Sequence, residues 1–222
     1  MAFPLDPRDY AAHTVPTTTE WDRLWHVWDA VTRGMVPEQE MLNRPIKLRN
    51  AVIFYLGHIP TFLDMQIKKS TNGELAESAY YASIFERGID PDVENPEHCH
   101  DHSEAPAEWP PLNEILVYQE QVREKVRSLY HTTAEKQRRV GRALWLGFEH
   151  EIMHLETLLY MLLQSDKTLP PPGMTKPDFA QVAKEAAANR VPNQWFEIPE
   201  QSIDIGLNDL EDNSGPDHHF GW

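Results

Sequence analysis

Apolar residues recur every three or four positions in four long segments of this 222-residue sequence, and this period most constrains its fold. The first segment follows residues 17–20, where a threonine precedes a glutamate by three positions, as in a capping box. One helical face then carries Trp21, Leu24, Trp25, Trp28 and Val31. We expect a helix over about residues 18–34, with its tryptophans packed in a core.

The second apolar segment, residues 47–68, contains a proline. Pro60 has no amide hydrogen to donate to the carbonyl of Leu56, and proline inside a helix bends it. We therefore expect a helix with a kink around His58.

Two further helices are predicted after a long connection. Residues 70–111 are rich in Asn, Gly, Asp, Pro and His, which is typical of a crossover with at most a short helical turn. Helical period returns at Leu112, and residues 132–135 offer a second capping box for a helix running to about Leu163. Four long helices with one long crossover predict an all-α four-helix bundle.

The pattern changes on both sides of the bundle, which we place at residues 17–168. Residues 1–16 contain three prolines and no apolar period, so we expect an extended lead-in. Residues 169–195 begin with a proline run and predict a linker with a short amphipathic helix near residues 177–189. Residues 196–222 then predict a different, β-containing tail.

Two observations support this last prediction. Residues 195–199 and 202–206 alternate apolar and polar side chains, as short strands do. The sequence then stops at Trp222, directly after an acidic, loop-like stretch. We expect the chain to be a piece of a longer protein whose second domain is incomplete here.

The charge balance excludes some functions. The chain has 35 acidic and 20 basic residues, a formal net charge of −15, and such a field repels phosphate backbones and anionic lipids. We expect neither nucleic-acid nor membrane binding. With the single cysteine Cys99 and no signal peptide at the start, the sequence favours a cytoplasmic location.

A candidate metal site lies in the fourth helix. His150 and His154 are four residues apart and therefore about 40° apart around the helix, so both imidazoles can reach one cation. The neighbouring residues are mostly apolar, and burying two imidazoles there without partners costs a few kcal/mol. A shared metal ion would satisfy them.

His58 is our candidate for a third ligand because it stands alone in the apolar second helix, beside Gly57 and near Pro60. A buried histidine of the core is the plainer alternative. Glu156 lies two residues past His154, about 200° around the helix, which is poor for joint chelation. We expect it to support the ligands or the fold and not to bind the metal directly.

The crossover contains a second group of possible ligands, His98, Cys99, His100 and His102. Such residues can bind zinc, but a structural site usually needs a further ligand pair elsewhere. Whether they hold a second metal or form an ordered polar loop stays open.

The sequence also resembles a known family. Gly57-His58 and residues 150–156 are similar to the DinB-type metal-binding bundle. Residues 29–35, 46–50 and 85–93 resemble the central domain of fungal ergothioneine-biosynthesis proteins, which are EgtB-like sulfoxide synthases. The resemblance covers about residues 17–222. Its last part is similar to the opening of a formylglycine-generating-enzyme-like (sulfatase-modifying factor) domain.

This resemblance implies non-haem Fe(II) held by His58, His150 and His154. It further implies oxidative joining of a thiol, cysteine or γ-glutamylcysteine, to hercynine with O2. The family's catalytic tyrosine lies in the second domain, so the catalytic residues are unknown here. Arg87 lies where the family binds carboxylates of the thiol substrate, although pairing with a local acid is an alternative.

Two other functions stay open. A zinc- or nickel-dependent thiol transferase or hydrolase would use the same histidines as a Lewis-acid site. A catalytically silent metal-binding scaffold would keep them without turnover.

Overall fold

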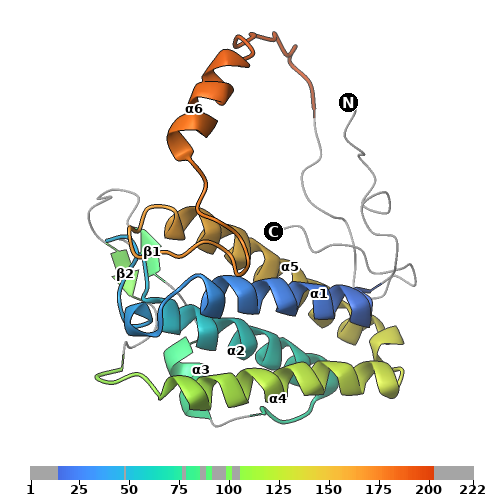
Figure 1. The fold of residues 1–222 in the computed structure, drawn as a ribbon. Coiled ribbons are helices and arrows are strands. Elements are labelled where there is room, and N and C mark those ends of the chain that lie inside the picture. The colour runs from blue at the N-terminus through green and yellow to red at the C-terminus, as the bar shows by residue number, and fades with distance from the viewer. Residues whose placement is uncertain are drawn as a thin grey trace.

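Four long helices form a bundle in the computed structural model, which describes residues 15–47, 49–76, 79–85, 89–91, 99–101 and 106–202 (Figure 1). The bundle helices are α1 (Thr18–Asp29), α2 (Val52–Thr71), α4 (Leu112–His131) and α5 (Arg138–Leu162). The predicted all-α bundle is therefore confirmed, with α2 packed against both α4 and α5.

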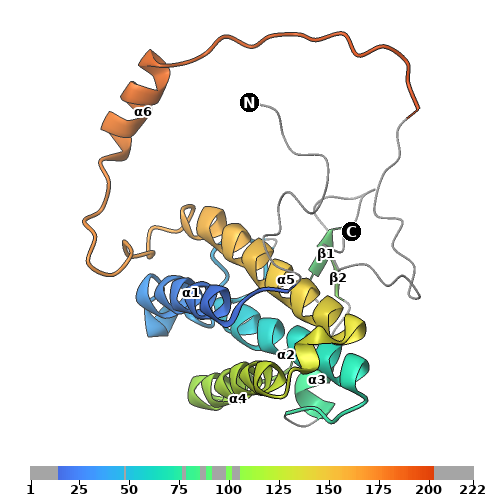
Figure 2. The same cartoon turned by 90° about the vertical axis from the view of Figure 1, so that its right-hand side faces the viewer.

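Shorter elements connect the bundle helices. Within the described residues they are the π-helical turn Ala30–Gly34, the 3-10 turns Glu38–Glu40 and Ala134–Lys136, α3 (Ala79–Phe85), β1 (Ile89–Pro91), β2 (Cys99–Asp101) and α6 (Phe179–Ala188). The two strands pair antiparallel, with Asp90 opposite His100, and the sequence analysis did not predict them. Figure 2 shows this pair near one face of the bundle, whereas α6 stands apart from it.

The capping box at the start of α1 is confirmed. The backbone amide of Glu20 donates to Oγ1 of Thr17 at 3.2 Å, and the amide of Thr17 donates to Oε2 of Glu20 at 2.6 Å. The tryptophans of α1 are buried as expected: Trp21 and Trp28 are at most 1% exposed. Their burial fixes the apolar face of α1 against the other helices.

The second predicted capping box is wrong. Thr132, the first residue of that box, ends α4 in a helical conformation, and Thr133 after it is left-handed, with φ of 58°. A 3-10 turn separates both threonines from α5. The residue that precedes α5 is the extended Gln137, whose side chain makes no capping bond. Because an N-cap residue must be extended directly before the first helical turn, a threonine that ends the preceding turn cannot cap α5.

Pro60 is buried inside α2, and the helix continues past it to Thr71. The segment predicted at residues 47–68 is thus a single helix that begins later and ends later than expected.

The predicted strand at residues 195–199 is wrong, since these residues form neither helix nor strand. Trp195, Phe196 and Ile198 are between 76% and 98% exposed, and no described strand lies beside them to pair with. An alternating segment without a partner strand gains too little to form a strand. Residues 203–206, the rest of that prediction, lie outside the described residues, as do residues 1–14.

None of the helices in the described part of the chain combines the length and apolarity needed to cross a membrane.

Gly57 allows α3 to lie directly against α2. A Cβ atom at this position would overlap the ring of Phe85, which is fully buried. Gly147 plays a similar part between α5 and α2, where a Cβ atom would meet the Cδ1 methyl of Leu63. Both glycines lie close in sequence to candidate metal ligands, since Gly57 directly precedes His58 and Gly147 lies three residues before His150.

We predict that Gly57→Ala lowers the free energy of unfolding by about 1–3 kcal/mol, because the buried aromatic ring of Phe85 cannot move aside. Gly147→Ala is the matched control. It should lower the free energy of unfolding less, because the Leu63 methyl that its Cβ would meet lies at the end of a flexible side chain. Denaturant unfolding of the two variants measures the difference. Equal stability of Gly57→Ala and the unchanged chain would contradict this account of the α2–α3 contact.

Candidate metal centre

Three histidines meet where α2 and α5 pack together. His58 comes from α2, and His150 and His154 come from successive turns of α5. One ring nitrogen of each histidine lies within 4.8 Å of the corresponding atoms of the other two. The ring centroids are 4.5–5.0 Å apart. The structure thus brings together the three residues that the sequence singled out.

A hydrogen bond fixes the orientation of His58. Its Nδ1 lies 2.6 Å from the backbone carbonyl oxygen of Phe85. Because a carbonyl can only accept, Nδ1 carries the proton and Nε2 keeps its lone pair. A hydrogen bond that fixes the tautomer in this way is typical of histidines that bind metals.

Aromatic rings hold the imidazoles from the sides. Phe54 stacks on His58 at 5.1 Å between ring centroids, and Phe62 stacks on His150 at 3.9 Å. Both phenylalanines belong to α2, one turn before and one turn after His58. They restrict ring rotation and surround the nitrogen atoms with apolar groups.

This environment keeps the histidines neutral. Burial, together with the neighbouring His154 and His58, lowers the pKa of His150 to about 2. Burial and the nearby His58 lower the pKa of His154 to about 3. Burial also lowers the pKa of His58, although its bond to Phe85 opposes the shift. Neutral imidazoles offer lone pairs to a cation near pH 7.

The cluster fits a bound transition metal by its unsatisfied atoms as well. Nδ1 of His150 and Nδ1 of His154 are buried and have no hydrogen-bond partner among the described residues. Buried polar atoms without partners are costly. A cation held by ring nitrogens of all three histidines would give the group a favourable partner, and three neutral nitrogens suit iron, zinc, nickel or copper.

The other predicted site residues are not in the cluster. Glu156 is exposed on α5 and does not belong to the three-residue group. Arg87, His98 and His102 lie outside the described residues, and only the backbone of Cys99 and His100, in β2, is described. The prediction for Arg87 and the question of a second metal therefore remain untested.

Sequence reasoning missed several groups around the site. Phe85 is 27 residues from His58 and contributes a backbone atom, so its identity carried no signal. Phe62, four residues after His58, could have been found by helical spacing. Glu151, next to His150, is buried, which raises its pKa to about 8 despite the nearby Arg123 and a bond from Trp25.

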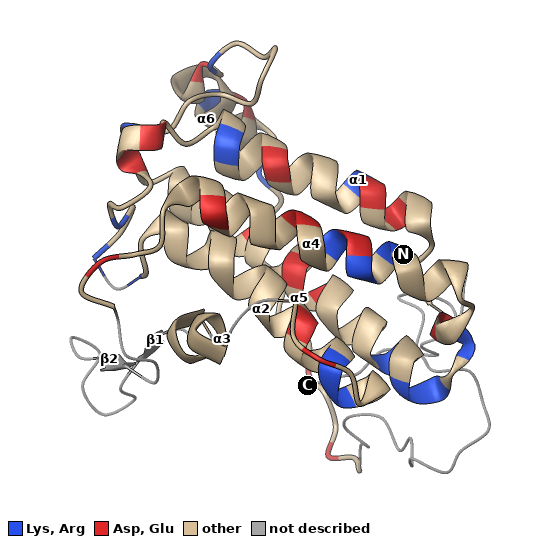
Figure 3. Ribbon diagram, turned by 90° about the horizontal axis from the view of Figure 1, so that it is seen from below, with Lys and Arg blue, Asp and Glu red and all other residues tan. Residues whose placement is uncertain are grey.

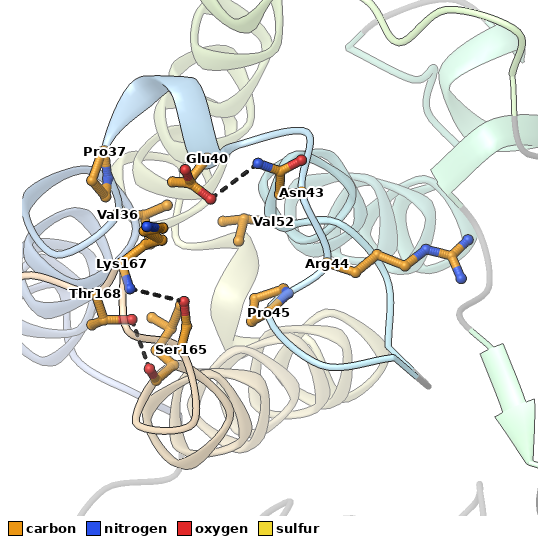
Figure 4. Close-up of a pocket in the computed structure, with 11 residues that line it drawn as sticks. Val36, Pro37, Glu40, Asn43, Arg44, Pro45, Val52, Ser165, Lys167 and Thr168 are labelled. Atoms are coloured by element: carbon orange, nitrogen blue, oxygen red, sulfur yellow. Dashed lines mark hydrogen bonds between the residues drawn. The ribbon is translucent and has the colours of Figure 1, made fainter.

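A separate pocket at the end of the bundle where α5 terminates is a poorer candidate (Figure 4). Its volume is about 30 Å³, room for one or two water molecules. Its polar groups bond to one another or to nearby backbone: Asn43 donates to Glu40, the amide of Lys167 donates to Ser165, and Thr168 donates to the carbonyl of Leu162. These polar groups already have hydrogen-bond partners within the protein, and they close the end of the bundle.

Comparison with known proteins places the histidine cluster in a family context. Residues 17–158 match the sequence profile of the DinB superfamily. The chain is 60% identical over 223 residues to "Ergothioneine biosynthesis protein 1" of Neurospora crassa. It is 34% identical over 209 residues to the protein of the same name from Schizosaccharomyces pombe. These alignments cover 100% and 93% of this chain but 26% of each relative.

The lowered pKa values predict that the metal-free chain loses stability in mild acid. His154 titrates near its ordinary pKa of 6.5 when unfolded but at about 3 when folded. Between these values the unfolded state holds the extra proton, so the free energy of unfolding falls as the pH falls. From pH 6.5 to 5 the loss is about 2 kcal/mol for this histidine.

Denaturant unfolding of the metal-free chain at both pH values measures this loss. His154→Gln is expected to reduce the pH dependence by that amount, and His131→Gln, at an exposed position of α4, is the control. An unchanged pH dependence in His154→Gln would show that His154 is not buried as a neutral group.

Proposed function

This chain belongs to the DinB superfamily, and we propose that its three-histidine cluster binds Fe(II) as the metal centre of a sulfoxide synthase in ergothioneine biosynthesis. The single observation that carries the proposal is the approach of His58, His150 and His154 to within 4.8 Å at their ligand atoms. The shared name of the two fungal relatives supports the choice of pathway.

The proposed reaction joins the sulfur of a cysteine-type thiol to an imidazole carbon of hercynine and oxidises that sulfur. The C–H and S–H bonds break and the C–S bond forms. One oxygen atom of O2 becomes the sulfoxide oxygen, and the other leaves as water with the two hydrogens. Fe(II) supplies a Lewis-acid and redox centre that can bring the thiolate and O2 together.

The side chains of this chain have a passive part in that chemistry. Three neutral nitrogens leave the charge of the metal uncompensated, which favours an anionic thiolate. The bond from His58 to Phe85 and the stacking of Phe62 on His150 hold two ligand rings in place. The apolar surroundings strengthen the attraction between cation and thiolate.

Residues outside the cluster complete the proposal. We place Arg87 as the group that binds a carboxylate of the thiol substrate, because a guanidinium can hold a carboxylate through two hydrogen bonds. We also propose that the bundle acts together with a formylglycine-generating-enzyme-like domain, which supplies the remaining substrate contacts and the catalytic tyrosine.

The test is anaerobic reconstitution with Fe(II). We expect about one iron per chain. Each of His58→Ala, His150→Ala and His154→Ala removes a proposed ligand and should lower the affinity by more than the roughly 10–100-fold that the loss of an outer-shell partner costs. His131→Ala, which removes an exposed histidine of α4, should bind iron as the unchanged chain does. Metal analysis after gel filtration gives the stoichiometry.

Substrate binding is tested on the same samples. Co(II) in place of iron should give a thiolate-to-cobalt absorption band when cysteine is added. Any O2 uptake with hercynine and cysteine should require iron, and iron binding without uptake would be consistent with a bundle that needs the second domain. A chain without specific iron would overturn the proposal and favour a silent scaffold. Preference for zinc or nickel, with thiol transfer or hydrolysis that needs no O2, would instead favour the other enzyme class.

A further inference from the structure

A pocket of about 250 Å³ lies where α2 ends and α5 begins, well away from the pocket at the opposite end of the bundle. It is much larger than the pocket of about 30 Å³ described above and a second pocket of about 10 Å³ between α1, α2, α4 and α5. Its lining comes from two helices: Gln66, Lys69 and Ser70 of α2, and Arg139, Arg142, Ala143 and Leu146 of α5.

The lining is basic. Among the described residues it contains three cationic side chains and no acidic one, in a chain whose formal net charge is −15. Lys68 and Arg138 add two more cations beside it in sequence. Figure 3 shows Lys and Arg gathered at this end of the bundle. Against an acidic background, such a concentration of positive charge attracts anions locally.

The charges on α5 also work against the stability of the helix. Its first turn holds no acidic residue, although the N-terminal end of a helix favours negative charge. Arg138 and Arg139 stand there instead, and Arg142 follows in the second turn. An anion in the pocket would relieve the repulsion between the arginines and the positive end of the helix.

The pocket lies along the same α2–α5 seam as the histidines. On α2, His58, Phe62, Gln66 and Lys69 follow one another at spacings of four, four and three residues. On α5, Leu146 lies one turn before His150, and Arg142 lies one turn further. With a rise of about 1.5 Å per residue, the pocket extends from about 6 to 17 Å along α5 from His150.

We propose that this pocket binds a small carboxylate- or phosphate-bearing molecule through Lys69, Arg139 and Arg142. Gln66 and Ser70 add polar groups that can hydrogen-bond to such a ligand, and Ala143 leaves room for it. Arg139 also donates a hydrogen bond to the backbone carbonyl of Lys69 at 3.2 Å. This bond holds the two cationic residues together across the pocket.

Isothermal titration of the metal-free chain with inorganic phosphate and with succinate tests the proposal and separates the two anion classes. We expect saturable binding of at least one of them, at one site per chain. Gln66→Glu places a carboxylate in the pocket with almost no change of shape and should weaken binding about tenfold. The anion affinity of Arg139→Gln, a substitution at an exposed position, gives a second test of the pocket that does not depend on Gln66.

Two control variants decide where the anion sits. Gln121→Glu adds the same charge on the exposed face of α4 and should change the affinity less than about twofold. His150→Ala should leave it unchanged, so the result does not depend on the proposed metal chemistry. No binding, equal weakening by Gln66→Glu and Gln121→Glu, or loss of binding in His150→Ala would each overturn the proposal.

Discussion

The burial of three imidazoles at the contact between α2 and α5 is the constraint around which the rest of the structure is arranged. Buried nitrogen atoms must be protonated, hydrogen-bonded or bound to a cation. Protonation is opposed here by burial and by the closeness of the three rings, which lowers all three pKa values. One nitrogen has a carbonyl partner, whereas Nδ1 of His150 and of His154 have none among the described residues. Burying these nitrogen atoms in an ordinary hydrophobic core is therefore costly, whereas burying them around a bound cation is favourable.

Small residues and the short helix α3 allow the helices to pack closely enough to bury the three imidazoles. Gly57 stands one position before His58, and the space where its side chain would be holds the ring of Phe85. The same close approach brings the carbonyl of Phe85 to Nδ1 of His58. The dipeptide Gly57-His58 is thus one structural unit, in which the glycine admits α3 and α3 orients the histidine. A side chain at position 57 would disturb both the packing and the tautomer.

The sequence correctly predicts those features that depend only on the spacing of residues along one helix. His150 and His154 share a helix face wherever that helix forms, and the tryptophans of α1 are buried as their spacing indicated. The start of α5 was mispredicted because residues 132–135 match a capping box, while the left-handed conformation of Thr133 depends on how α4 ends. The role of Phe85 could not be predicted, since a backbone carbonyl gains its function from tertiary packing across 27 residues. The partnerless segment at residues 195–199 shows that alternation alone does not make a strand.

The α2–α5 seam combines two different environments. Around the histidines it is apolar, with Phe54 and Phe62 against the rings. Further toward the start of α5 it is basic and open. Coulomb attraction between exposed charges acts over about one Debye length, roughly 8–10 Å at physiological salt, so the basic pocket acts on anions near the first turns of α5. An anion that approaches the chain meets a net negative charge overall and a local group of basic residues at this seam. The basic residues at the start of α5 therefore place local positive charge on a chain whose net charge is negative.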